Sequence, residues 1–348
     1  MSLPELHALI LLVALIAYAL LGGADFGGGV WDLLASGPRA RAQRETIARA
    51  IGPIWEANHV WLILAVVLLF TAFPPAFAAI MTALHVPITL MLIGIVLRGS
   101  SFVFRTYDSR RSVVQRRWGR VFAISSVVTP VLLGIVIGTI STPAITIDDG
   151  VVTSGFFRPW LRPFPFAVGA FALAQFAFLA AVYLCVDATE PALREDFRRR
   201  ALACALLLAP LAFAVYALSY TAAPELHRDL AGSRWSLALH LATGAAALGV
   251  IGALWKRRFL LARALAAAQV ALILLGWGLS LQPYLIAGQL TIAAAAAPPV
   301  TLRLVLGALA VGSLLLLPAF YYLYRTFKGG LIFDAAEGVT GEEAEHAE

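Results

Sequence analysis

Nine apolar stretches, each about 20 residues long, constrain this chain more than any other feature of its sequence. They cover roughly residues 6–27, 53–73, 76–98, 119–141, 165–187, 201–221, 235–254, 260–282 and 302–324. About 20 apolar residues in a helix cross the roughly 30 Å of bilayer hydrocarbon. The composition agrees, since 61% of the residues are hydrophobic and only 13% are charged, against about 25% charged in a typical soluble domain. The sequence therefore predicts an all-α polytopic membrane protein with nine transmembrane helices.

The distribution of the 26 Lys and Arg residues predicts the orientation of these helices. If the N-terminus lies outside, 21 of them fall in segments on the inside and five in segments on the outside. Inside loops of membrane proteins carry the excess of positive charge, so we predict an N-out, C-in topology. The net charge of +6 then reflects topology rather than affinity for nucleic acid, because no nucleic-acid-binding motif accompanies the basic residues.

Four spans precede a long outside segment and four follow it, which predicts two four-helix bundles plus one peripheral helix. The expected divisions are a first bundle (1–141), an outside connection (142–164), a second bundle (165–282), an outside connection with the ninth helix (283–325), and an inside tail without regular structure (326–348). Two connections carry turn signals. Residues 73–75 are expected to form a tight hairpin between the second and third spans, and residues 148–150 a turn.

The stretch of residues 55–61 concentrates polar side chains at the inside end of the second span. It holds Glu56, Asn58 and His59, and an acid at the centre of a membrane helix costs roughly 2.5–3.5 kcal/mol. Glu56 and His59 are three residues apart and are therefore expected to share a helix face. Because Asp25 approaches the membrane from the same predicted side, we infer a path for protons or cations from the cytoplasm.

Simpler interpretations stay open for each of these residues. Glu56 could be a helix-start acid favoured by the positive end of the helix dipole, with Trp55 and Trp61 as anchors at the membrane interface. Asp25 could be a hydrated carboxylate near a helix end. Arg98, near the inside end of the third span, is expected to snorkel or to form a salt bridge rather than to take part in chemistry.

The histidines do not form a recognisable cofactor site in the sequence. Those at positions 7, 59, 85, 227 and 240 supply no convincing pair of haem ligands. We therefore predict no metal site and no haem ligation by this chain.

The motifs, taken in order, resemble subunit II of the cytochrome bd-type quinol oxidases over nearly the whole chain. Residues 22–29 resemble the family's D-G-x-D-x-G-x-G, and residues 55–61 resemble its W-D-G-N-x-V-W. Partial matches are Arg98, Phe102, Phe104 and Arg105 to R-x-x-x-F-x-[FY]-R, Pro130, Gly134 and Gly138 to P-x-x-x-G-x-x-x-G, and residues 162–164 to N-P-F. Gly22 stands in place of an acid, Glu56 in place of Asp, and His59 where the family often has Glu or Gln. The chain is therefore interpreted as a divergent branch.

The resemblance implies a subunit without its own haem. In that family, subunit I holds haem b and haem d, oxidises quinol and reduces dioxygen to water, while subunit II stabilises it and lines part of the cytoplasmic proton route. The resemblance gives the role of route acid to Glu56, in a complex of the bacterial cytoplasmic (inner) membrane. From the clustered polar residues we predict that His59, Asn58 and Asp25 assist Glu56. The resemblance leaves open whether a structural quinone or a membrane lipid occupies this chain, and whether a small accessory subunit joins the complex.

Two other functions are compatible with the sequence. A proton- or cation-coupled secondary transporter could use Asp25 and Glu56 as coupling acids, but it would be expected to have broken helices and repeats of inverted topology. A scaffold that assembles its partner and conducts nothing would need none of the polar residues for turnover.

Overall fold

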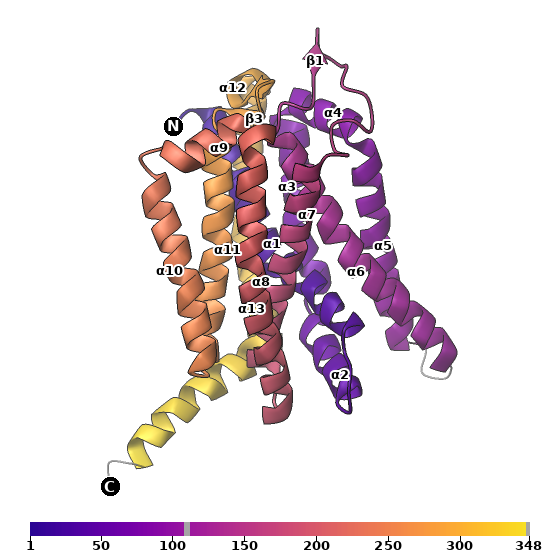
Figure 1. Ribbon diagram of the computed structural model, residues 1–348, viewed down its shortest axis with the longest axis vertical. Helices are drawn as coiled ribbons and strands as arrows, with labels where there is room; N and C mark the ends of the chain where they lie inside the picture. Colours follow the sequence, from indigo (N-terminus) through magenta and orange to yellow (C-terminus); the bar gives the residue numbers. More distant parts are fainter. Residues whose placement is uncertain (108–111, 346–348) are drawn as a thin grey trace.

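A computed structural model of the protein describes residues 1–107 and 112–345, with side chains for 1–104 and 117–327. Its helices are α1 (Leu3–Leu33), α2 (Ala40–Ile51), α3 (Trp55–Ala72), α4 (Pro74–Ala83), α5 (His85–Tyr107), α6 (Ser112–Ile140), α7 (Pro163–Asp187), α8 (Pro191–Ala222), α9 (Pro224–Gly232), α10 (Ser236–Trp255), α11 (Phe259–Leu281), α12 (Ile292–Ala295) and α13 (Pro299–Glu345). Within these ranges, nine helices are long and apolar enough to cross a membrane, which confirms the predicted all-helical membrane architecture (Figure 1).

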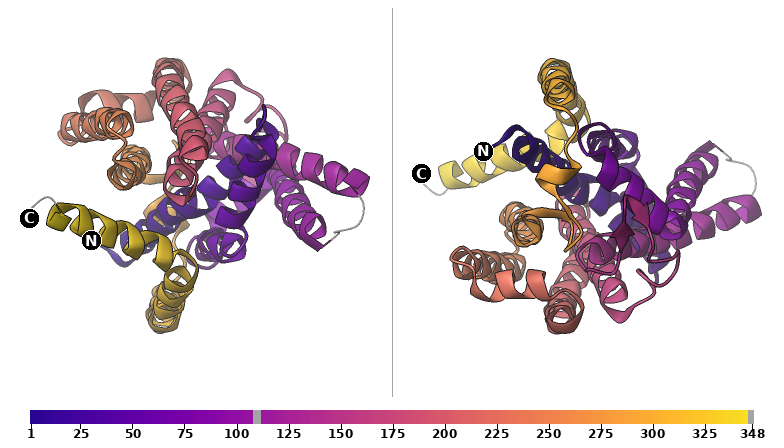
Figure 2. Two further views of the ribbon diagram at one scale, coloured as in Figure 1. Left: turned by 90° about the horizontal axis from the view of Figure 1, so that it is seen from below. Right: turned by 90° about the horizontal axis from the view of Figure 1, so that it is seen from above.

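Helix α1 lies at the centre of the molecule and packs against α3, α6, α7, α11 and α13 (Figure 2). It continues without a break through its run of glycines. A Cβ atom on Gly27 would lie 1.9 Å from the carbonyl oxygen of Phe176 in α7, and one on Gly29 would lie 2.1 Å from Ser126 Oγ in α6. The glycines therefore allow close helix packing and do not bend the helix.

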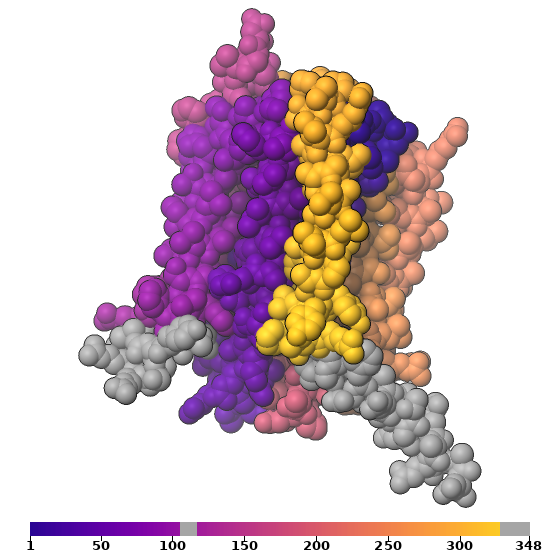
Figure 3. All heavy atoms as spheres, turned by 180° about the vertical axis from the view of Figure 1, so that it is seen from behind, coloured from indigo at the N-terminus to yellow at the C-terminus, as the bar shows by residue number. Residues whose placement is uncertain are grey.

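The largest hydrophobic core joins the two halves of the chain. It contains Phe26 of α1, Phe176 and Phe178 of α7, and Phe197 of α8. This core crosses the boundary proposed between the two four-helix bundles, and the division into two bundles stays a prediction. Helix α13 differs from the rest: it packs on α3 and α1 at the outer surface, and only 6% of its most apolar stretch is buried (Figure 3).

The third span begins later than the apolar pattern predicts. Residues 74–83 form the separate short helix α4, and the spanning helix α5 starts at His85. Pro87 has no N–H to donate to the carbonyl of residue 83, and its ring would clash with that carbonyl, so one helix cannot run smoothly through this point. The tight hairpin expected at residues 73–75 is therefore wrong. Phe73 instead links α3 directly to α4.

The connections expected outside gather at one end of the molecule (Figure 1). Strands β1 (Ile147–Asp148) and β2 (Val151–Val152) pair as a hairpin. Asp149 and Gly150 between them have φ values of 46° and 78°, and two positive φ values are typical of a two-residue hairpin turn. The predicted turn is confirmed. Strands β3 (Tyr284–Ile286) and β4 (Leu290–Thr291) form a second antiparallel pair.

Two helices extend beyond the segments predicted from hydropathy. Helix α8 begins at Pro191, ten residues before the predicted sixth span, and its first turns carry charged residues that the apolar pattern excludes. Helix α13 continues to Glu345, through most of the tail for which we expected no regular structure. Ala and Glu are frequent in that tail and are strong helix formers. Residues 346–348 of the tail lie outside the described residues.

Candidate functional site

Residues 55–61 form the first two turns of α3 and point their polar side chains in different directions. Asn58 is fully buried, whereas Glu56, about 200° away around the helix, is exposed. His59 is half-buried, and its ring centroid lies 5.8 Å from that of Tyr18 in α1. Glu56 and His59 therefore have different surroundings, although a spacing of three predicts a shared face. About 60° of rotation separates them, and two aromatic rings of α1, those of Tyr18 and Phe26, pack against His59.

A chain of hydrogen bonds joins three helices at Asn58. Asn58 Nδ2 donates to Asp25 Oδ2 in α1 at 2.7 Å, and the hydroxyl of Tyr324 in α13 donates to Asn58 Oδ1 at 2.5 Å. Asp25 is only 3% exposed. The structure thus brings Asp25 and Asn58, two of the predicted site residues, into direct contact. Tyr324 was not predicted, because no motif near the end of the ninth span marks it.

Arg98 of α5 brings a buried positive charge to the same region. Its side chain is 2% exposed and interacts electrostatically with Asp25. The guanidinium carbon lies 4.6 Å from the ring centre of Phe26 and 5.2 Å from that of Phe122, within the range of cation–π attraction. Nε donates to Ser126 Oγ at 3.2 Å. Arg98 therefore does not snorkel; of the two expected roles, only charge pairing fits its burial.

A cavity of about 50 Å³ borders Asp25 and Asn58. A buried water needs roughly 10–15 Å³ of such space, so the cavity has room for about three waters. Polar side chains of other helices also line it: Tyr183 and Asp187 of α7, Arg263 of α11 and Tyr324 of α13. This arrangement can hold a short chain of waters beside Asp25. None of these four residues was predicted, because each lies in a span that shows no polar motif in the sequence.

Glu56 faces a separate groove, which is lined by Glu45 and Arg49 of α2, Trp55 of α3 and Phe102 of α5. Asp25 does not line this groove, and Glu56 does not line the cavity at Asp25. The two acids therefore do not meet in one site, although we expected them to converge from the same side of the membrane. The Glu56 carboxylate has no hydrogen bond or ion pair within the described part of the chain.

Trp55 and Trp61 connect α3 to its neighbours. The ring centroid of Trp55 lies 6.1 Å from that of Phe102 in α5, and Trp61 stacks on Phe320 of α13 at 5.7 Å. Trp61 Nε1 is buried and has no hydrogen-bond partner among the residues whose side chains are described. Trp61 therefore packs between helices, which differs from the interface position expected for it.

The surroundings of His59 do not fit a haem ligand. Its Nδ1 donates to the carbonyl of Trp55 at 2.8 Å, and the rings of Tyr18, Phe26 and Trp55 pack around it. An axial ligand needs an open space for the porphyrin face, which these rings occupy. Over residues 1–107 and 112–345, no group of three or more His, Cys, Asp or Glu side chains is arranged to hold a metal ion.

Comparison with known proteins relates this architecture to a family. The family model described as "Cytochrome bd terminal oxidase subunit II" matches residues 3–327. A provisionally named cytochrome bd menaquinol oxidase subunit II of Bacillus subtilis is 23% identical over 325 residues, which is 89% of this chain and 91% of that protein. The cytochrome bd-I ubiquinol oxidase subunit 2 of Escherichia coli is 28% identical over 180 residues, which is 49% of this chain and 45% of that protein.

A shorter match and a solved structure complete the comparison. The cytochrome bd ubiquinol oxidase subunit 2 of Bacillus subtilis is 29% identical over 139 residues, so the chain spans only 40% of that relative's length. The fold is similar to that of a chain in the bd oxidase structure from Geobacillus thermodenitrificans. The TM-score is 0.80 at 23% identity, and the match covers 94% of this chain and 99% of that one.

Proposed function

Because the chain belongs to the cytochrome bd terminal oxidase subunit II family, we propose that it pairs with a haem-bearing subunit I and delivers protons to it through Glu56. The chain is a multi-pass membrane protein related to a subunit of an oxidoreductase complex. In this proposal the complex lies in the bacterial cytoplasmic membrane. Haem b and haem d of the partner supply the redox chemistry by which quinol is oxidised and dioxygen is reduced to water.

The exposure of Glu56 is the observation that carries this proposal. Further along α3, on the same face, lie three exposed apolar side chains: Ile63 (60% exposed), Val67 (48%) and Phe70 (57%). They follow Glu56 at spacings of 7, 11 and 14 residues, which place them along one side of a helix. An apolar stripe that ends in a single carboxylate fits a surface covered by a hydrophobic partner. An acid at that position can pass a proton across the interface.

The groove gives Glu56 access to protons. Water in the groove reaches the carboxylate beside Glu45 and Arg49. The carboxylate takes a proton from this water and becomes neutral. It then gives the proton to an acceptor on the partner and regains its charge. When the partner covers the stripe, bulk water is excluded on that side, so protons reach the acceptor through Glu56 and not through open water.

Asp25 has an indirect role in this proposal. The hydrogen bond from Asn58 and the nearby charge of Arg98 hold the Asp25 side chain in place, which positions α3 and therefore Glu56. The unbroken course of α1 through Asp25 also favours the oxidase role over a secondary transporter, in which a broken helix is expected at the ion site.

Oxygen consumption by the assembled complex carrying Glu56→Gln tests the proposal. We expect a loss of about tenfold or more, because an amide cannot release a proton and acid–base groups typically contribute roughly 10²–10⁴-fold. Glu56→Asp keeps a carboxyl group and is expected to retain activity. Glu45→Gln is the matched control, since this acid lines the same groove but is paired with Arg41. Unchanged oxygen consumption and unchanged assembly of the Glu56→Gln complex would overturn the proposal.

A further inference from the structure

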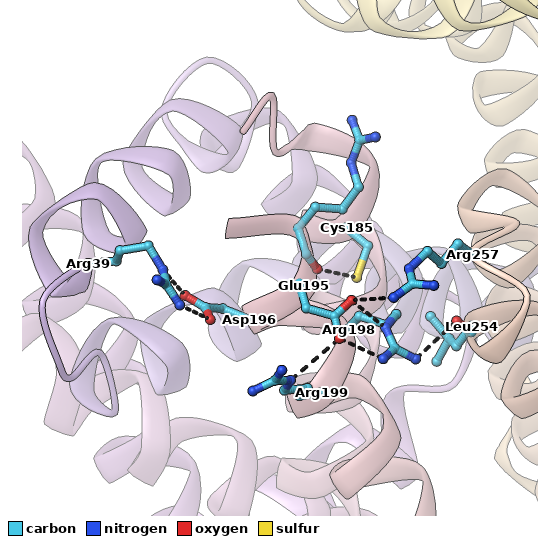
Figure 4. Close-up of polar contacts among 9 residues, drawn as sticks. Arg39, Cys185, Glu195, Asp196, Arg198, Arg199, Leu254 and Arg257 are labelled. Carbon is cyan, nitrogen blue, oxygen red and sulfur yellow. Dashed lines mark hydrogen bonds and ion pairs between the residues drawn. The ribbon is translucent and has the colours of Figure 1, made fainter. Parts of the chain in front are cut away.

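A cluster of arginines lies where α8 meets the connection between α10 and α11 (Figure 4). None of these arginines lines the cavity at Asp25 or the groove at Glu56. Glu195 of α8 is contacted by three guanidinium groups. Arg198 binds it through two nitrogens, at 2.6 and 2.8 Å. Arg199 Nε lies 3.4 Å and Arg257 Nη2 lies 3.6 Å from its oxygens. Three positive charges around one carboxylate leave the cluster with a net charge of plus two.

The three arginines differ in how much of each is available to another molecule. The Arg198 side chain is 14% exposed, and it also donates to the Leu254 carbonyl at the end of α10, at 3.5 Å. The side chains of Arg199 and Arg257 are 75% and 66% exposed, and each meets Glu195 through one nitrogen. Because arginine has five N–H donors, both can offer donors to a further acceptor. Glu195 thus holds two exposed guanidinium groups close together.

The backbone just after α10 places Arg257 beside Glu195 in a conformation that is unfavourable for a residue with a Cβ atom. The N–H groups of Arg257 and Arg258 donate to the carbonyls of Leu254 and Ala253, at 3.2 and 2.8 Å, which is the hydrogen-bond pattern of a Schellman motif. Arg257 has a φ of +56°, in the position that glycine usually occupies because it lacks a Cβ. An arginine there is unfavourable for the backbone, and its side chain reaches Glu195.

Exposed apolar side chains adjoin these positive charges. We call Arg199, Lys256, Arg257 and Arg258 the basic corner, and all four are exposed. Next to it lie Trp255 (76% exposed), Leu260 (43%) and Leu261 (46%). Tryptophan beside basic residues at the end of an apolar helix is typical of the boundary between lipid headgroups and hydrocarbon. The basic corner lies at the same end of the molecule as α2, which the charge distribution predicts to be cytoplasmic (Figure 1).

We propose that the basic corner binds the phosphate group of an anionic phospholipid, whose acyl chains lie against Trp255, Leu260 and Leu261. Adjacent guanidinium groups match the oxygens of a phosphate in geometry and charge. The apolar neighbours favour an anion that carries acyl chains over a soluble phosphate ester. Helices α3 and α10 lie on different sides of α1 (Figure 2), so a partner on the α3 stripe leaves the basic corner open to lipid.

Lipid binding to the purified, delipidated complex tests this proposal. The complex is titrated with dioleoyl-phosphatidylglycerol or dioleoyl-phosphatidylcholine, and bound lipids are counted by native mass spectrometry. We expect Arg199→Gln and Arg257→Gln each to weaken phosphatidylglycerol binding about fivefold, the effect typical of one basic residue at an anionic lipid surface. Binding of phosphatidylcholine should not change. Unchanged phosphatidylglycerol binding in both variants would overturn the proposal.

Two controls distinguish a lipid site at the basic corner from non-specific charge attraction and from a site for a soluble phosphate ester. Arg41→Gln removes an arginine of α2 that is 93% exposed and paired with Glu45 at the same end of the molecule; it should leave phosphatidylglycerol binding unchanged. An equal loss in this control would show non-specific charge attraction and contradict a site at the basic corner. Glycerol 3-phosphate, which has no acyl chains, should not displace the lipid at equal concentration. Displacement would assign the corner to a soluble phosphate ester instead.

Discussion

Asp25 and Glu56 lie on neighbouring helices and have opposite surroundings. Asp25 is 3% exposed, accepts a hydrogen bond from Asn58 and interacts with the charge of Arg98. Glu56 is exposed, lines an open groove and ends an apolar stripe on α3. The comparison separates two environments for an acid in a membrane protein. The Asp25 carboxylate is held as part of the packing, whereas the Glu56 carboxylate is the one that carries protons in our proposal.

The difference follows from what each acid would disturb by changing its charge. Burial of a carboxylate costs several kcal/mol unless an opposite charge and hydrogen bonds compensate it. Protonation of Asp25 would remove that compensation from Arg98, which is also buried, and would weaken the contact between α1 and α5. Glu56 has no described bonding partner, so its protonation leaves the helix packing unchanged. We therefore propose proton transfer for Glu56 and structural support for Asp25.

The largest expected effect is on the buried side of this comparison. Arg98→Leu leaves Asp25 without its positive neighbour, and breaking a buried charge pair typically costs roughly 3–5 kcal/mol. Asp25→Leu should cost about as much. Because the two charges interact, the double variant should lose less stability than the sum of the single variants. Thermal unfolding of the assembled complex measures these losses, and strictly additive values would show that Asp25 does not depend on Arg98.

A smaller loss is expected from Gly27→Ala, two residues beyond Asp25 on α1. The new Cβ would overlap the Phe176 carbonyl oxygen and push α1 away from α7; overpacking of this kind typically costs about 1–3 kcal/mol. Gly252→Ala in α10 is the matched control, since a Cβ there meets no atom within 4 Å. It should not destabilise the complex. Equal thermal midpoints for the two variants would contradict the close packing that positions Asp25.

The smallest effect is expected from Tyr324→Phe, which removes the donor to Asn58 Oδ1. The loss of one hydrogen bond typically lowers the free energy of unfolding by about 0.5–1.5 kcal/mol, and oxygen consumption should stay near that of the parent complex. Tyr322→Phe is the control on the same helix, because Tyr322 is 72% exposed. If Tyr324→Phe abolished oxygen consumption as Glu56→Gln is expected to do, the proton route would run through the cavity at Asp25. The roles of the two acids would then be reversed.

Much of the fold follows from the sequence, because hydrocarbon sets the length of a spanning helix. Nine apolar stretches correspond to nine helices among the described residues that can cross a membrane. The predicted third span began too early in the sequence, because hydropathy counts apolar residues and does not register the break before Pro87. The start of α8 was missed for the opposite reason: its first turns are helical but charged.

The site was less predictable than the fold. The residue types around Glu56 pointed to one stretch of α3 as the candidate site, and two of the residues assigned to that site, Asn58 and Asp25, are in contact. The rotation of α3 that turns Asn58 inward and Glu56 outward could not be predicted from the residue pattern. Tyr324 lies 266 residues from Asn58, and only the packing of α13 against α3 brings the two together. Such contacts depend on tertiary structure and have no local signal.

Proton uptake during a single reaction with dioxygen tests the central claim most directly. The assembled complex carrying Glu56→Gln is fully reduced and then mixed with dioxygen in weakly buffered solution that contains a pH indicator. If Glu56 passes protons to the partner, uptake should slow by about tenfold or more, the lower range for loss of an acid–base group, whereas Glu45→Gln should keep the parent rate. Uptake at the parent rate by the Glu56→Gln complex would contradict a role for Glu56 in proton delivery.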